Sequence, residues 1–122
     1  MKKLIIEHVK GKVINEGVNE REVRLLASPY SQIKREDFSV GVTIIQPGHV
    51  HEEHRHVDHQ ELIVVLGGEG IARVSGEEFI VSRGCVIDLE KNEPHKFINN
   101  GESNLELLWI YSPPGPEKKF LL

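Results

Sequence analysis

Apolar and polar residues alternate with a period of two in two well-separated parts of the chain. In residues 38–44 apolar side chains alternate with small or polar ones, and the same alternation returns in residues 105–111, shortly before Pro113. Successive side chains of a strand point to opposite faces, so each stretch is expected to form a strand with one apolar face. Because proline cannot donate to a ladder, the second strand is expected to end there.

Short apolar runs separated by glycines fill residues 61–89. The separators are Gly67-Gly68, Ser75-Gly76 and Arg83-Gly84. Glycine accepts the positive φ of tight turns without steric cost, so these positions are expected to be turns between short strands. The pattern predicts an all-β fold, a sandwich or a barrel.

The ends of the chain carry weaker signals. Residues 3–8 and 22–28 are strand-like, and residues 30–38 have room for one turn of helix. The tail, residues 113–122, is rich in proline and is expected to be extended, with its last residues packed on a partner or frayed.

The composition is typical of one globular domain. The chain has 122 residues, of which 39% are hydrophobic and 28% charged, and its formal net charge is −4. These values exclude a disordered chain and do not support a nucleic-acid partner. We expect a single domain over residues 1–122, with N-terminal strands in 1–35, the barrel core in 36–112 and a tail in 113–122.

No segment suggests a membrane partner or an export signal. The first apolar run, Leu4-Ile5-Ile6, ends at Glu7 and is too short for either. The single cysteine, Cys85, cannot form an internal disulfide, which is typical of a reducing compartment. The sequence therefore predicts a cytoplasmic protein.

Five of the seven histidines lie between residues 48 and 61. His54 and His56 are two residues apart, so on a strand both imidazoles point to one side. A bend near Val57 would aim Glu61 at the same point, and a fourth ligand could come from His95 on a later strand. Histidine-rich surface loops are common, so the pair alone leaves a solvated loop open as an alternative.

Two stretches of the chain resemble the two conserved motifs of the cupins. The first has Gly48, His54, His56, Glu61 and Gly68 at the motif's spacing, and the second has Gly84, His95 and Asn99. The resemblance covers roughly residues 36–112. It implies an antiparallel double-stranded β-helix, the jelly-roll or cupin barrel, with a metal ion held by His54, His56, Glu61 and His95.

The second motif departs from the family pattern in two places. Glu90-Lys91-Asn92 stands where the family usually has Pro-x-Gly, and Cys85 stands where it often has an acidic residue. Asparagine tolerates the left-handed backbone region better than other side chains do, so Asn92 can replace the glycine.

Strand parity extends the expected site to neighbouring residues. The candidate lining residues of the cavity are His59, Ile63, Val65 and Phe97. His49 and His51 precede the ligands by an odd number of residues and are expected to face away. Parity does not decide which side of their strands Val42, Arg73, Trp109 and Tyr111 occupy.

The resemblance implies one divalent ion per chain, with Mn, Fe, Zn, Ni and Co as candidates. Four protein ligands on a six-coordinate ion leave two positions for a small, anionic, chelating ligand. We expect a metal-dependent enzyme, such as a dioxygenase, decarboxylase, isomerase or lyase, that acts on a small oxygenated metabolite. The alternatives are a non-catalytic sensor or storage protein and a barrel whose metal is only structural. We also expect a homodimer that pairs through the N-terminal strands.

Overall fold

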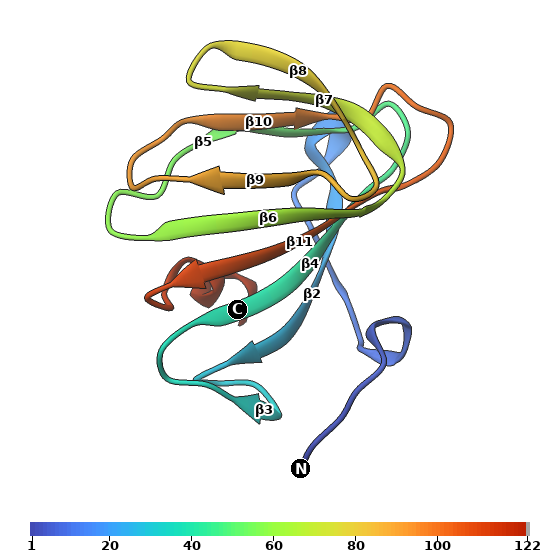
Figure 1. Ribbon diagram of the computed structural model, residues 1–122. Coiled ribbons are helices and arrows are strands. Elements are labelled where there is room, and N and C mark those ends of the chain that lie inside the picture. Colours follow the sequence, from blue (N-terminus) through green and yellow to red (C-terminus); the bar gives the residue numbers. More distant parts are fainter. Residues whose placement is uncertain (122) are drawn as a thin grey trace.

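The computed structural model describes residues 1–121, and its strands form two facing sheets (Figure 1). The larger sheet has the order β1 (Lys12–Ile14), β2 (Arg21–Ser28), β4 (Ser39–Ile45), β11 (Leu105–Ser112), β6 (Gln60–Gly67) and β9 (Val86–Leu89), with β3 (Ile33–Lys34) beside β2. The smaller sheet has the order β5 (Val50–His54), β10 (His95–Ile98), β7 (Glu69–Val74) and β8 (Glu77–Ser82). Three short 3₁₀ helices complete the described part of the chain: η1 (Ile6–His8), η2 (Gly17–Asn19) and η3 (Pro116–Leu121).

Apart from the short parallel pair of β2 and β3, every strand pair is antiparallel. Neighbours in the larger sheet are often distant in sequence, as β4 and β11 are, whereas β7 and β8 are joined by a tight turn. This is the expected all-β jelly-roll, and the prediction of fold class is confirmed. Of residues 1–121, no helix has the length and apolar character needed to cross a membrane.

The main core lies between the two sheets. The alternation predicted for residues 105–111 is present in β11, where every second side chain is buried and points between the sheets. Phe97 from β10 meets this face and is fully buried. The rest of the cluster is Val23, Ile45, Ile63, Val65, Ala72, Val81, Ile87, Leu89, Leu105, Leu107, Trp109 and Tyr111.

Both faces of β4 are buried, which the alternation in residues 38–44 does not predict. Val42 and Ile44 pack with Leu26 in a second cluster, and residues Leu4, Ile6 and Val9 of the N-terminal segment cover that outer face. The opposite face of β4 points into the barrel.

The inner face of β4 is shaped by one tryptophan. The indole of Trp109 lies so close to Gly41 that a Cβ at this position would overlap the ring. The same indole donates a hydrogen bond from Nε1 to Oγ1 of Thr43 over 2.9 Å. The small Gly41 and the polar Thr43, which alternate with the apolar residues of β4, therefore accommodate the indole of Trp109.

The two ends of the chain differ from their sequence-based expectations. Residues 3–8 do not form a strand: they lead into η1, whereas residues 22–28 lie in β2. Residues 30–38 contain turns and β3 instead of a turn of helix. The tail is not extended but forms η3, where Oε2 of buried Glu117 accepts a hydrogen bond from the Gly115 N–H over 2.7 Å. Phe120 packs on the main core, and Leu122 lies outside the described residues.

Candidate metal centre

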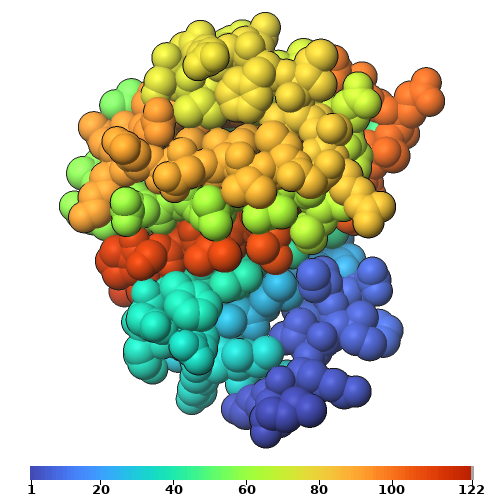
Figure 2. All heavy atoms as spheres, in the orientation of Figure 1, coloured from blue at the N-terminus to red at the C-terminus, as the bar shows by residue number. Residues whose placement is uncertain are grey.

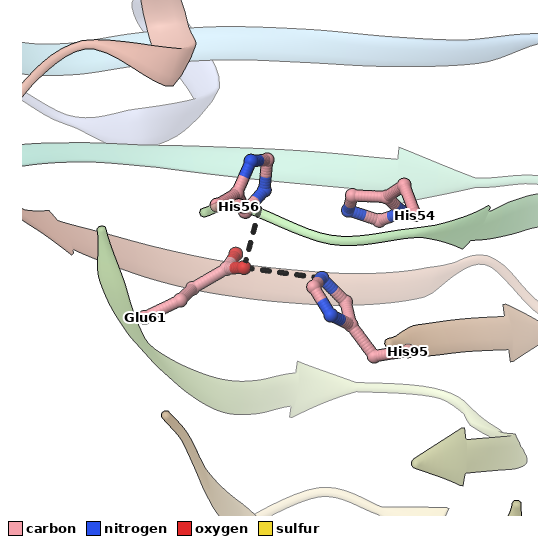
Figure 3. A group of neighbouring side chains, drawn as sticks. All are labelled: His54, His56, Glu61 and His95. Atoms are coloured by element: carbon pink, nitrogen blue, oxygen red, sulfur yellow. Dashed lines mark ion pairs between the residues drawn. The ribbon is translucent and has the colours of Figure 1, made fainter. Parts of the chain in front are cut away.

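Four side chains from both sheets meet at one point of the barrel interior (Figure 3). His54 ends β5, His56 follows it in the connection to β6, Glu61 lies on β6 and His95 begins β10. Each offers one ligand atom, and these atoms all lie within 4.8 Å of one another. The structure thus brings together the four residues that the sequence singles out.

Strand pairing explains how the histidines meet. His54 and His95 are direct partners across the β5–β10 ladder. Asn92 has a φ of 64° and donates its backbone N–H to the His56 carbonyl over 2.8 Å. The loop that departs from the family pattern thus adopts the left-handed turn that an asparagine tolerates, and it fixes the backbone of a candidate ligand.

Three of the candidate ligand atoms are buried and lack a hydrogen-bond partner among residues 1–121. They are Nε2 of His56, Oε1 of Glu61 and Nε2 of His95. Oε1 of Glu61 lies 3.6 Å from Nε2 of His56 and 3.2 Å from Nε2 of His95. Buried polar atoms nearly always have a hydrogen-bond partner, so three unpaired ones that converge on one point indicate a missing partner. A metal site requires nitrogen and oxygen ligand atoms in this arrangement.

The backbone orients two of the imidazoles. Nδ1 of His54 lies 2.9 Å from the Glu52 carbonyl, and Nδ1 of His95 lies 2.9 Å from the Glu93 carbonyl. A carbonyl only accepts, so each Nδ1 must carry the proton and each Nε2 keeps its lone pair. Such a hydrogen bond on the far nitrogen is the usual support of a metal-binding histidine.

The electrostatics also favour neutral imidazoles. Burial, followed by the proximity of His95, lowers the pKa of His54 to about 3. The same two causes, in the same order, lower the pKa of His56 to about 4. Because only a neutral imidazole can bind a metal, both side chains are in the ligand form at neutral pH. The donor set therefore fits a divalent ion that accepts nitrogen and carboxylate ligands.

His51 points inward, contrary to the parity argument. Its ring stacks on that of His54 with the centroids 4.2 Å apart, and it lines the cavity. The cause is a register shift: His95 pairs with His54, but Phe97 pairs with His51, so β5 has one extra residue in this interval. A β-bulge of this kind reverses the side on which preceding side chains lie. His49 lies apart from the group, with Nδ1 2.9 Å from the Glu20 carbonyl.

The cavity beside the candidate ligands is small, with a volume of about 10 Å³. Two of the candidate lining residues, Ile63 and Phe97, border it, whereas Val65 is buried in the core and does not. His59 does not border it either: its Nδ1 lies 2.7 Å from the Pro113 carbonyl and its ring packs on Gly115 of the tail.

Of the four residues whose direction strand parity does not decide, two point into the barrel and two point out of it. Trp109 and Tyr111 stack on each other and line the cavity. Arg73 points outward and pairs with Glu78 at 3.0 Å, and Val42 lies in the outer cluster.

Two residues of the tail belong to the wall of the cavity. Lys119 and Phe120 of η3 border it together with residues of the sheets. No motif or periodicity marks them in the sequence, because the tail reaches the cavity through tertiary packing. The one signal in the sequence is that Phe120 is a large apolar residue, which favours its burial against the rest of the protein.

Comparisons with known proteins agree with the geometry. The family described as the cupin domain matches residues 41–111. A protein of Methanocaldococcus jannaschii described as uncharacterized protein MJ1618 is 28% identical over 108 residues, covering 88% of this chain and 83% of that protein.

Solved structures share the fold at low sequence identity. The crystal structure of a predicted oxalate decarboxylase from Thermotoga maritima matches with a TM-score of 0.82 and 21% identity, covering 93% of this chain and 100% of that one. The polyketide cyclase RemF from Streptomyces resistomycificus matches with a TM-score of 0.81 and 22% identity, covering 95% and 82%. With both motifs placed at one buried group of ligands and the family matched over most of the barrel, the chain belongs to the cupin domain family.

Proposed function

We propose that His54, His56, Glu61 and His95 bind one divalent metal ion per chain, and that the protein is a metal-dependent enzyme acting on a small anionic metabolite. The observation that carries the proposal is the convergence of buried, unpaired ligand atoms from His56, Glu61 and His95. Leaving three such atoms unpaired in the interior is costly, and a bound cation removes that cost. Three imidazoles and one carboxylate suit a transition-metal ion such as Mn, Fe, Zn, Ni or Co.

The charge and the number of ligands define the class of substrate. A single carboxylate leaves a divalent ion with a net positive charge, which favours an anion. Four protein ligands leave two positions on an ion that accepts six, so a substrate with two neighbouring oxygens is favoured. When bound, the ion would supply Lewis-acid chemistry to that substrate.

The residues around the ligands support a catalytic role over simple storage. Phe97, Trp109 and Ile63 present apolar surface to the cavity and exclude bulk water, which strengthens electrostatic interactions there. Tyr111 brings a phenol beside Glu61, and burial, followed by the Glu61 charge, raises its pKa well above 10. The phenol therefore keeps its proton and can donate a hydrogen bond to a bound ligand. The similar folds of a predicted oxalate decarboxylase and of a polyketide cyclase support an enzyme of this general kind.

The test of this proposal is calorimetry with oxalate and acetate on metal-loaded and metal-free protein. Oxalate offers two oxygens to one ion, whereas acetate offers a weaker, mainly single contact. We expect oxalate to bind the loaded protein at least about tenfold more tightly than acetate, and to bind the metal-free protein no better than acetate does. Equal binding of oxalate to both forms would contradict an open metal site and leave a structural metal as the better account.

We further propose that the protein is a homodimer. Ile5 and Tyr30 are exposed beside a groove of about 630 Å³ that the N-terminal segment forms with β2. Figure 2 shows the N-terminal residues (blue) beside the cyan segment that contains β3, at one end of the molecule. A second copy would cover this apolar surface and the edge strand β1. Light scattering should give a mass near twice 13.8 kDa, and a monomeric mass at micromolar concentration would contradict the proposal.

A further inference from the structure

Lys119 on η3 and Arg21 at the start of β2 lie beside the candidate metal centre. Lys119 borders the inner cavity together with Glu61 and His95. It also borders an outer pocket of about 450 Å³, in which Arg21 and Glu52 are among the lining residues. Lys119 therefore stands at the boundary between the metal centre and this outer pocket.

Neither cation has a close counter-charge. Among residues 1–121, no Asp or Glu oxygen lies within 4.0 Å of the side-chain nitrogens of Arg21 or Lys119. Arg21 is only 6% exposed, and its guanidinium donates one hydrogen bond, from Nη1 to the Asn19 carbonyl over 3.0 Å. Within residues 1–121, the arginines that do pair with carboxylates are Arg24, Arg35 and Arg73.

The two cations also repel each other. Burial lowers the pKa of Lys119, and the neighbouring Arg21 charge lowers it further, while Glu61 and Glu52 oppose the shift. Burial lowers the pKa of Arg21 as well, against the opposing effect of Glu52. The outer pocket is lined by three cationic residues, Lys12, Arg21 and Lys119, and by one acidic residue, Glu52. It therefore keeps a positive charge that a bound anion would neutralise.

We infer that Arg21 and Lys119 form a second anion subsite, so that the ligand of the metal centre carries two separated anionic groups. This inference rests on the proposed function and names its class of substrate. One end of the ligand chelates the ion with neighbouring oxygens, and the other end places a carboxylate or a phosphate between Lys119 and Arg21. Guanidinium and ammonium groups are the usual partners of both anions.

The dimensions of the two spaces support this arrangement. The inner cavity, at about 10 Å³, has room for roughly one water molecule. A ligand of several carbon atoms does not fit inside this cavity, and the outer pocket adjoins it at Lys119 and Phe120, the residues that border both spaces. The ring of Phe120 offers apolar contact to the carbon chain, and the ammonium of Lys119 lies 5.3 Å from the centre of that ring.

The experiment measures binding of matched ligands to protein loaded with Mn²⁺. 2-Oxoglutarate and 2-oxopentanoate have the same chelating end and carbon number, but only the first has a distal carboxylate. 3-Phosphoglycerate and glycerate form the corresponding pair for a distal phosphate. Calorimetry is done on the wild type, Lys119→Met, Lys119→Arg and, as the matched control, Lys118→Met, which removes a neighbouring charge of the same helix that does not border the inner cavity.

We expect the wild type to prefer the doubly anionic member of at least one pair by roughly tenfold, and the pair that shows this preference identifies carboxylate or phosphate as the distal group. Lys119→Met should abolish the preference by weakening the doubly anionic ligand much more than the singly anionic one, whereas Lys119→Arg and Lys118→Met should keep the preference. A wild type without preference, or a preference that survives Lys119→Met, would overturn the inference alone. If 2-oxopentanoate and glycerate bind loaded and metal-free protein equally, the proposed function itself fails.

Discussion

Replacement of Glu61 by glutamine is expected to lower the affinity for the metal by more than about a hundredfold. Glutamine keeps the shape of the side chain but removes the negative charge from an atom, Oε1, that lies within 3.6 Å of two imidazole nitrogens. Loss of a residue that merely supports a metal ligand already costs about 10–100-fold, so loss of a ligand should cost more. His95→Gln should have a similar effect. Metal content by mass spectrometry after dialysis, with circular dichroism to verify folding, measures both.

His49→Gln is the matched control, because His49 lies in the same histidine-rich segment but bonds to Glu20 away from the ligand group. It should bind metal as the wild type does. His51 is not suitable as a control, because its ring stacks on His54. Retention of metal by folded Glu61→Gln, together with its loss in His49→Gln, would show that the ligands have been assigned wrongly.

Phe97→Ala is expected to lower the free energy of unfolding by about 3–5 kcal/mol. Phe97 is fully buried between the sheets, borders the cavity and follows His95 by two residues on β10. The truncation leaves a void in the part of the core that supports the metal centre. Urea denaturation of the metal-free protein, monitored by Trp109 fluorescence, gives the change in unfolding free energy.

Phe38→Ala provides the comparison for this loss of stability. Phe38 is only half-buried, with the Arg35 guanidinium 4.9 Å from the centre of its ring. Its truncation should cost less than about 1.5 kcal/mol. Equal losses for the two variants would contradict the assignment of Phe97 to the centre of the core.

The strands and the first three candidate ligands could be predicted from the sequence because their signals are local, whereas His95 was added by the resemblance of residues 84–99 to the second cupin motif. Alternation marks β4 and β11, and the spacing of His54, His56 and Glu61 is contained in eight residues of one motif. The inward direction of His51 could not be predicted, because it depends on a bulge that exists only once β5 pairs with β10. Parity arguments fail wherever a register shift intervenes.

The structures of the two chain ends depend on tertiary packing, so local sequence patterns do not predict them. The N-terminal segment reads as a strand because Leu4, Ile5 and Ile6 are apolar, but Leu4 and Ile6 cover the outer face of β4 instead. The tail reads as extended because it is rich in proline, but the burial of Phe120 against Trp109 draws it into η3 over the cavity. Neither contact has a signature in the local sequence.

The central claim is that one metal ion lies among His54, His56, Glu61 and His95. Its most direct test is a crystal structure of protein grown with the divalent ion that it retains, with diffraction data collected at that ion's absorption edge. One anomalous peak per chain, at about 2.0–2.3 Å from a ligand atom of each of the four residues, is the expected result. A peak bound to other residues, or the absence of a peak at these four in protein that carries stoichiometric metal, would contradict the claim.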